Sequence, residues 1–123
     1  MPLSTLEGFD LTLVEQTDAS DVNFEYVRRT DTLFLMLVKE REPHATYFLA
    51  DGVHLMCSAG TKRVVGFRVE HWRKLFLQRR RGLAPHWYWF CFTSWLSRLI
   101  KAFKPSAASK ARLYRAVVDY ARA

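Results

Sequence analysis

The feature that most constrains the fold is a change in the period of the hydrophobic pattern at His71. Before it, apolar side chains occupy alternate positions, as Val65, Phe67 and Val69 do, which is the pattern of a strand with one buried face. After it, apolar side chains recur at the spacing of a helical face, beginning with Trp72. The chain is therefore predicted to change from strands to helices within a few residues of His71.

The segments before this change predict an antiparallel β-meander of about four or five strands. The strongest hairpin signal is Asp51-Gly52, because this dipeptide suits the central positions of a tight turn. The run 33–38 is apolar on both faces, so its strand is predicted to be central and covered. The predicted strands are Leu11–Val14, Phe24–Arg28, Thr32–Lys39, Ala45–Leu49, Val53–Ser58 and Arg63–Glu70.

The segments after the change predict two or three C-terminal helices. The first ends at Gly82 and Pro85, which are helix-stop residues. The second runs from about His86 to Lys104 and the third from Ser106 to Arg122. The second helix carries one apolar stripe of Tyr88, Phe92, Trp95, Leu99 and Phe103, and the third directs Leu113, Val117 and Tyr120 inward.

Strands followed by helices define the predicted class as α+β, a small antiparallel β-meander followed by C-terminal helices. The length of 123 residues fits a single domain, 1–123, in which residues 1–70 are β-rich and residues 71–123 are helical, basic and aromatic. The residues expected to be buried are Leu35, Leu55, Val65, Phe67, Val69 and Trp72.

Charge is divided unequally between the two halves of the chain. Residues 1–60 hold four basic and ten acidic residues, a net −6. Residues 61–123 hold fifteen basic and two acidic residues, a net +13. Such a division indicates contact with nucleic acid, an anionic membrane or an acidic protein.

Basic residues are densest between residues 62 and 81, where the only acid is Glu70. The planar guanidinium fork suits bidentate contact with phosphate, and phosphate neutralisation supplies most sequence-independent affinity for nucleic acid. A solvated helix face is the alternative interpretation. The predicted nucleic-acid-binding residues are Lys62, Arg63, Arg68, Arg73, Lys74, Arg79, Arg80 and Arg81.

The aromatic stretch 86–103 has three interpretations. It is a core helix that packs on the sheet, a partner-binding helix with aromatic anchors, or an interfacial membrane helix with cationic flanks. Its rings could also stack on unpaired bases, which requires that they be exposed. The predicted partner-binding residues are Trp87, Trp89, Trp95, Arg98 and Lys101.

No motif for catalysis or metal binding is present, so the chain is predicted not to be an enzyme and to hold no metal or cofactor. Its four histidines lie apart, and His54 and Cys57, three residues apart on a strand, would point to opposite faces. Cys57 and Cys91 are predicted to be small buried thiols. The N-terminus lacks the basic start and apolar stretch of a signal peptide, so a cytoplasmic protein is expected.

Three segments carry a resemblance to a known family. They are Asp31-Thr-Leu-Phe-Leu, Ala50-Asp-Gly-Val-His-Leu and Arg63-Val-Val-Gly-Phe-Arg-Val. Over residues 24–72 the chain resembles an uncharacterised bacterial domain family of small β-meander proteins. The resemblance implies a fold and no activity, and it transfers no site residues. The basic, aromatic tail departs from the family's pattern.

The first hypothesis is a non-enzymatic, basic protein that associates with RNA or DNA, or a small subunit of a nucleoprotein complex. One alternative is an interaction subunit whose aromatic C-terminal helix docks in a partner while its basic face meets an acidic protein surface. The other is a peripheral membrane-associated protein. Salt dependence separates the first two, because affinity that depends on phosphate contacts falls steeply with salt.

Overall fold

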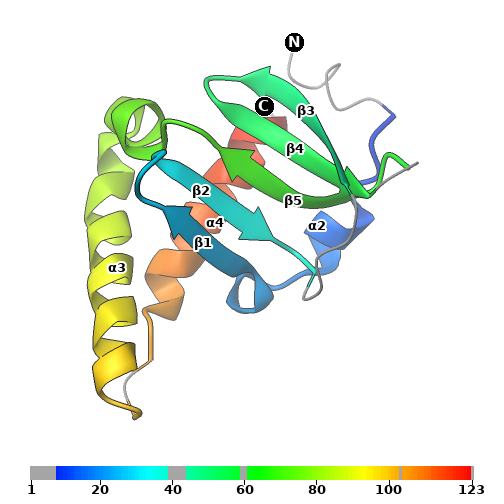
Figure 1. Cartoon of the computed structure of the whole chain (residues 1–123). Helices are drawn as coiled ribbons and strands as arrows, with labels where there is room; N and C mark the ends of the chain where they lie inside the picture. The colour runs from blue at the N-terminus through cyan, green and yellow to red at the C-terminus, as the bar shows by residue number, and fades with distance from the viewer. Residues whose placement is uncertain (1–7, 39–43, 59–60, 103, 123) are drawn as a thin grey trace.

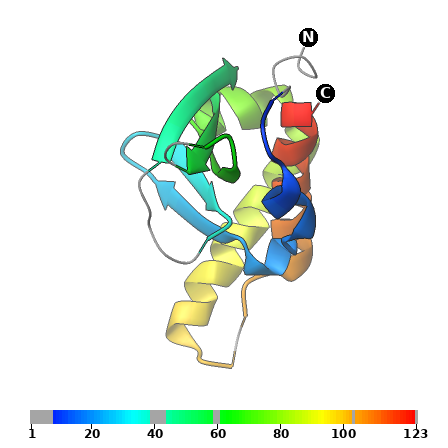
Figure 2. The same ribbon diagram turned by 90° about the vertical axis from the view of Figure 1, so that its right-hand side faces the viewer.

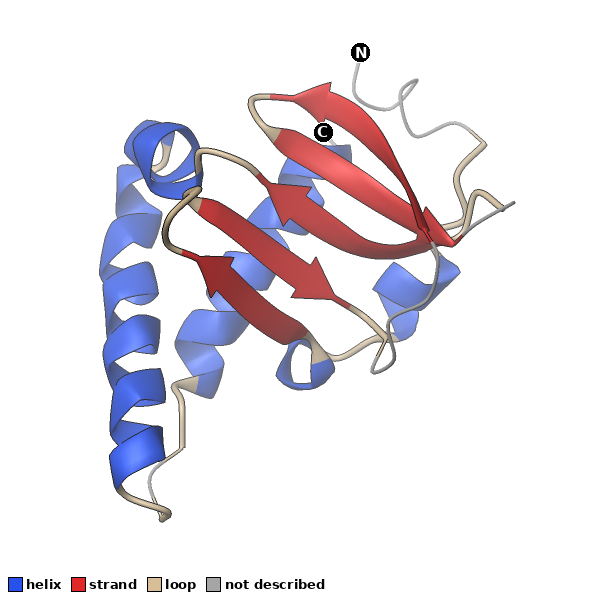
Figure 3. Ribbon diagram, in the orientation of Figure 1, coloured by secondary structure: helices blue, strands red, loops and turns tan. Residues whose placement is uncertain are grey.

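The computed structural model describes residues 8–38, 44–58, 61–102 and 104–122, and it confirms the α+β class. An antiparallel sheet is followed by helices, of which α4 lies behind the sheet and α3 stands beside it at one edge (Figures 1 and 3). The strands are β1 (Asn23–Val27), β2 (Thr32–Met36), β3 (His44–Ala50), β4 (Val53–Ser58) and β5 (Val64–Val69). The helical elements are α2 (Thr12–Gln16), η1 (Ala19–Asp21), η2 (Trp72–Leu77), η3 (Arg81–Leu83), α3 (Ala84–Leu99) and α4 (Ala107–Arg122).

The sheet has the strand order β1-β2-β5-β4-β3, so β5 lies in the middle, between β2 and β4. The predicted central strand, β2, is an internal strand of this sheet. Its residues Leu33 and Leu35 are fully buried, whereas Phe34 and Met36, which point to the other face, are half-buried. One face is therefore sealed, and Figure 2 shows α2 and α4 on that side.

The core lies between the covered face of the sheet and α4. One row of paired residues crosses all five strands through Phe24, Leu35, Phe67, Leu55 and Tyr47. From α4, Leu113 and Val117 complete this cluster and are fully buried. The predicted core residues Leu35, Leu55, Val65, Phe67, Val69 and Trp72 are all buried.

The predicted change from strand to helix at His71 is confirmed, since β5 ends at Val69 and η2 begins at Trp72. His71 itself has a left-handed backbone with φ 54°, which turns the chain sharply out of the sheet. The first segment after it is a π-helix, in which Trp72 and Phe76 stack with ring centroids 5.1 Å apart. Both rings are fully buried, so η2 is fixed on the sheet by its aromatic side.

Three predicted elements differ from the structure. Strand β2 ends at Met36, short of the predicted end at Lys39, which lies outside the described residues. Leu11–Val14 is not a strand, since residues 12–14 belong to α2, and the Asp10 carboxylate accepts the N–H of Thr12 at 3.0 Å in the turn that leads into this helix. The middle helix, α3, begins at Ala84 and ends at Leu99 instead of Lys104. The backbone N–H of Ser106 donates to the Thr93 hydroxyl at 2.9 Å, which brings the chain back toward α3 before α4 begins.

Helix α3 packs on the sheet, but not through its predicted stripe. Trp87 and Thr93 are buried and Phe90 is half-buried, with Trp87 5.1 Å from the Tyr26 ring and Phe90 5.2 Å from the Phe24 ring. The predicted stripe faces solvent at Tyr88, Phe92, Trp95 and Leu99, and Phe103 lies outside the described residues. No helix in the described part of the chain combines the length and the apolarity needed to cross a membrane.

Replacing Phe67 with alanine tests the core. The side chain is fully buried at the centre of the sheet, and truncation of such a ring costs about 3–5 kcal/mol of unfolding free energy. The matched control is Phe48→Ala on the same sheet, whose ring is 62% exposed and whose loss costs about 1 kcal/mol or less. Urea denaturation measures both. Equal stability of the two variants would contradict the placement of β5.

A candidate anion-binding site beside helix α3

One end of the sheet is built from turns and helix starts. The β1–β2 turn, the end of β5, η2 and the first turn of α3 meet there (Figure 1). Between them lies a hollow of about 790 Å³, which we name the basic pocket. Its basic and acidic lining residues are Arg28, Arg29, Asp31, Arg73, Lys74 and Arg81, and His71 also lines it. Five permanent cations thus face one carboxylate.

That carboxylate, Asp31, is occupied by contacts within the protein. Its oxygens accept the Tyr26 hydroxyl at 2.6 Å, the Arg73 N–H at 3.1 Å from each oxygen and the Lys74 N–H at 3.1 Å. Its own carbonyl accepts the N–H of Trp72 at 2.9 Å. Asp31 therefore caps the start of η2 and joins it to the β1–β2 turn. A further anion in the pocket meets cations rather than a free carboxylate.

These contacts set the charge state of the pair formed by Asp31 and Tyr26. Burial alone would raise the pKa of Asp31, but the hydrogen bonds from Tyr26 and from the backbone of Arg73 and Lys74 lower it below its ordinary value. Burial and the hydrogen bond to Asp31 raise the pKa of Tyr26 to about 12. At neutral pH, Asp31 is charged and Tyr26 keeps the proton that it donates.

A second hollow of about 470 Å³ adjoins the first, and we name it the aromatic pocket. Its rings are Phe24, Tyr26, Trp87, Tyr88, Phe90 and Trp95, and its cations are Arg28, Arg73 and Arg98. The two pockets share Tyr26, Arg28, Arg73 and Tyr88. A basic surface therefore passes directly into an aromatic one.

Tyr88 stands at the junction of the two pockets with 52% of its surface exposed. The Arg73 guanidinium donates to its hydroxyl at 3.2 Å and lies 5.6 Å from its ring centroid. This contact holds the ring in place, and about half of the residue's surface stays exposed. Arg73 therefore links the charged and aromatic parts of the site.

The structure places the eight predicted nucleic-acid-binding residues in separate locations. Arg73, Lys74 and Arg81 line the basic pocket. Lys62 and Arg63 lie at the opposite end of β5, where the Lys62 ammonium covers the rings of Phe9 and Tyr47. Arg68 lies on β5 and forms an ion pair with Glu70 at 3.1 Å. The cluster that is dense in the sequence is therefore divided in space.

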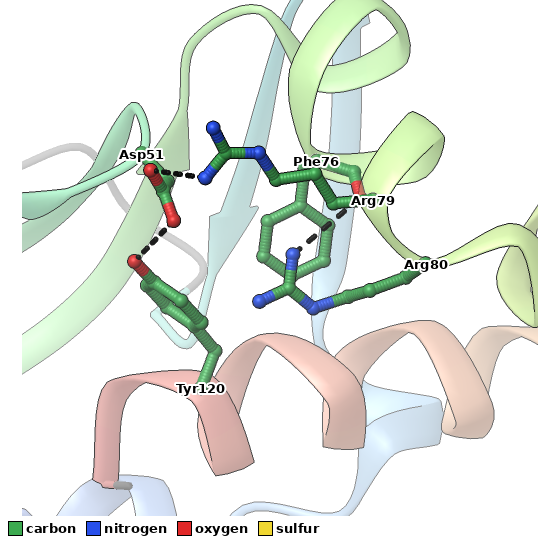
Figure 4. Close-up of polar contacts among 5 residues, drawn as sticks. All are labelled: Asp51, Phe76, Arg79, Arg80 and Tyr120. Carbon is green, nitrogen blue, oxygen red and sulfur yellow. Dashed lines mark hydrogen bonds and ion pairs between the residues drawn. The ribbon is translucent and has the colours of Figure 1, made fainter.

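The remaining two, Arg79 and Arg80, are engaged in contacts with the fold (Figure 4). Arg79 forms an ion pair with Asp51 at 2.9 Å, and Asp51 also accepts the Tyr120 hydroxyl at 2.9 Å. The Arg80 guanidinium lies 4.0 Å from the centroid of the Phe76 ring and 4.7 Å from that of Tyr120. These two arginines join η2 to α4 and to the β3–β4 turn, away from the basic pocket.

Sequence reasoning missed Arg28, Arg29 and His71 as members of the site. The two arginines belong to the acidic half of the chain and reach the pocket because β2 pairs with β5. The signal that could have found them is their position in a turn, directly before the left-handed residue Asp31. His71 enters because it makes the turn between β5 and η2.

The predicted partner-binding residues also separate. Trp87 is 2% exposed and packs against the rings of Tyr26 and Trp72, so its ring belongs to the core behind the aromatic pocket. Trp89, Trp95, Arg98 and Lys101 are exposed. Trp95 and Arg98 line the aromatic pocket, whereas Trp89 and Lys101 line neither pocket.

Among residues 8–38, 44–58, 61–102 and 104–122, no three His, Cys, Asp or Glu side chains gather as a metal site requires. Burial raises the pKa of the Cys57 and Cys91 thiols, so both stay protonated at neutral pH. Cys57 is fully buried and Cys91 is half-buried beside the aromatic pocket. The basic and aromatic pockets together suit a ligand in which an anionic group is joined to a flat ring.

Replacing Asp31 with asparagine tests the carboxylate that organises the site. Asparagine tolerates the left-handed backbone but turns a donor toward backbone N–H groups, so a loss of about 1.5–3 kcal/mol of stability is expected at pH 7. A carboxylate with a lowered pKa stabilises the fold above its unfolded value near 3.9, and this contribution disappears as pH falls through the lower folded value. The variant should therefore lose less stability than wild type on acidification.

Urea denaturation at pH 7 and in acid measures this difference. Asp119→Asn, at an exposed position on α4, is the control. Similar curves for the two variants would contradict the role of Asp31.

Comparison of the chain with family models, curated proteins and solved structures gave no match. The resemblance over residues 24–72 stays a prediction, and the candidate function rests on the geometry of the two pockets.

Proposed function

We propose that this protein binds single-stranded nucleic acid across the two adjoining pockets, with phosphate in the basic pocket and a base against the aromatic one. The observation that carries this proposal is the junction itself, where Arg28, Arg73 and Tyr88 belong to both hollows. A nucleotide has the same two components, an anion joined to a flat ring. Proteins that bind single strands combine a positive groove with stacking rings in this way.

The charge of the basic pocket supports the phosphate half of the proposal. In the described part of the chain, Arg28, Arg29 and Arg81 are exposed and form no ion pair with an acid. The pocket's carboxylate accepts hydrogen bonds from Tyr26 and from backbone N–H groups, and its single negative charge leaves the five cations of the pocket in excess. Their guanidinium groups can form bidentate hydrogen bonds with phosphate oxygens.

The position of the remaining cations favours a single strand over a duplex. Lys62 and Arg63 lie at the far end of β5, and Arg79 and Arg80 are engaged with Asp51 and with the rings of Phe76 and Tyr120. These four residues therefore do not continue the positive surface of the basic pocket, as contact with the backbone of a duplex would require. A short segment with an unstacked base fits the two hollows better, because it can present its ring to Tyr88.

The salt dependence of oligonucleotide binding tests the phosphate half. Labelled single-stranded DNA and RNA should bind wild type at low salt with little sequence preference. Replacing Arg28, Arg29 and Arg81 together with glutamine should flatten the log–log salt slope by about 2, at about 0.7 per contact on a single strand. Fluorescence anisotropy at several salt concentrations measures the slope.

The matched control removes the same charge elsewhere, with Arg63, Arg112 and Arg115 replaced by glutamine at exposed positions. An equal change in both triple variants would show general attraction to a cationic protein and would reject the pocket. Absence of binding by wild type at low salt would reject nucleic acid altogether. If polyglutamate then bound through the same three arginines, an acidic protein would be the partner.

Tyr88 tests the ring half independently. Tyr88→Ala should weaken single-strand binding by about 1–3 kcal/mol without changing the salt slope, because stacking does not depend on counterion release. Tyr88→Phe keeps the ring and should bind nearly as wild type does. Equal affinity of all three proteins would remove stacking from the mechanism.

A further inference from the structure

Helix α3 carries a row of large apolar side chains along its solvent-facing side. We name this row the aromatic ridge, and its members are Trp89, Phe92, Trp95, Leu99 and Ile100. Between 47% and 64% of each side chain is exposed. Contiguous exposed apolar surface on a soluble protein often marks a site of contact with another protein or with a membrane.

The three rings of the ridge lie close together along the helix, and Leu99 and Ile100 follow them at its C-terminal end. Ring centroids of Trp89 and Phe92 lie 5.8 Å apart, and those of Phe92 and Trp95 lie 6.1 Å apart. The opposite side of α3 is already packed, with Trp87 and Thr93 buried. The ridge therefore remains uncovered in the described part of the chain.

The shape of this surface is convex. Helix α3 forms one edge of the molecule, and its C-terminal end projects beyond the sheet (Figures 1 and 2). A projecting ridge can insert into the deformable surface of a lipid bilayer. Tryptophan and aliphatic side chains, which the ridge carries, favour the boundary between lipid headgroups and acyl chains. Aliphatic side chains such as Leu99 and Ile100 give no stacking platform for bases.

The charges around the ridge decide which partner complements it. From Ala84 to Lys104 the sequence contains no acidic residue, and Arg98, Lys101 and Lys104 follow the ridge at its C-terminal end. A second copy seated on the ridge would bring these cations against one another or against Arg81 in η3, just before α3. An anionic surface avoids that repulsion and is attracted instead.

We propose that the aromatic ridge docks the protein on the surface of an anionic lipid bilayer. The ridge side chains lie at the headgroup boundary, and Arg98, Lys101 and Lys104 contact lipid phosphates. The apolar contribution and the electrostatic contribution add, as in other interfacial helices. Its members Trp89, Phe92 and Leu99 line neither pocket, whereas Trp95 and Arg98 also line the aromatic pocket, so the two proposed surfaces adjoin.

Co-sedimentation with lipid vesicles tests this proposal. Wild type should bind vesicles of phosphatidylcholine mixed with phosphatidylglycerol more tightly than vesicles of phosphatidylcholine alone, and added salt should weaken the binding. Replacing Trp89, Phe92 and Leu99 together with glutamine should lower the partition coefficient at least about tenfold, because the buried apolar area is lost. All three positions face solvent, and a thermal melt checks that the variant folds.

The matched control is Phe48→Gln, which removes an exposed ring from the sheet and should bind vesicles as wild type does. Tryptophan emission gives a second readout, because Trp89 and Trp95 are exposed and should shift to the blue on binding, while Trp72 and Trp87 are already buried. Trp95 is left unchanged in the triple variant because it also lines the aromatic pocket.

Three outcomes would overturn the proposal. The first is absence of binding to phosphatidylglycerol vesicles at low salt. The second is equal vesicle binding by wild type and the triple variant, which would mean attraction by charge alone. The third is a concentration-dependent dimer that the triple variant abolishes, without vesicle binding, which would make a second copy the occupant. Oligonucleotide binding of the triple variant stays as in wild type in each case, so the two proposals fail separately.

Discussion

The contact between Asp31 and the start of η2 is the interaction on which the rest of this structure depends. The chain leaves the sheet through a left-handed residue, His71, and the next turn has to be fixed in one orientation. The carboxylate of Asp31 accepts the N–H groups of Arg73 and Lys74, which holds that turn against the β1–β2 hairpin. Trp72 is thereby directed into the core and Arg73 toward the surface. One side chain thus determines both the packing and the charge at this end of the sheet.

A second aspartate supports the same end of the molecule from the other hairpin. Asp51 also has a left-handed backbone, and it joins Arg79 of the segment after η2 to Tyr120 of α4. Its neighbour Gly52 allows the hairpin to approach the end of β5 closely, since a Cβ there would clash with the carbonyl oxygen of Glu70. The π-helical segment is therefore held at both ends by carboxylates from turns. π-Helical turns are frequent where a protein positions functional groups.

The local sequence pattern was sufficient to predict most of the fold. The class, the Asp51-Gly52 hairpin and the change at His71 follow from the hydrophobic period and turn chemistry, which act over a few residues. The side of α3 that packs on the sheet could not be predicted in this way. Its first two turns are apolar all round, so period alone does not decide whether Trp87 or Tyr88 points inward. Contacts with β1 made that choice, and they depend on tertiary structure.

The candidate site was only partly predictable for the same reason. Arg73, Lys74 and Arg81 follow from the local density of charge, whereas Arg28 and Arg29 join them through the pairing of β2 with β5. Spacing along the chain also gave no sign that Arg79 and Arg80 are held by Asp51 and by aromatic rings. Charge density identifies a basic segment, but only the fold decides which of its cations are available.

The basic pocket is shared between two segments that are distant in the chain, the β1–β2 turn and the helical region that begins at His71. In the unfolded chain these segments are apart, so the pocket does not exist there. Any ligand that fills it binds the native state alone, and at a hundred times its dissociation constant it adds about 2.7 kcal/mol to the stability of the fold. The repulsion among the pocket's own cations acts in the opposite direction when no ligand is bound. The free energy of unfolding is therefore greatest when a bound anion neutralises the cations of the basic pocket.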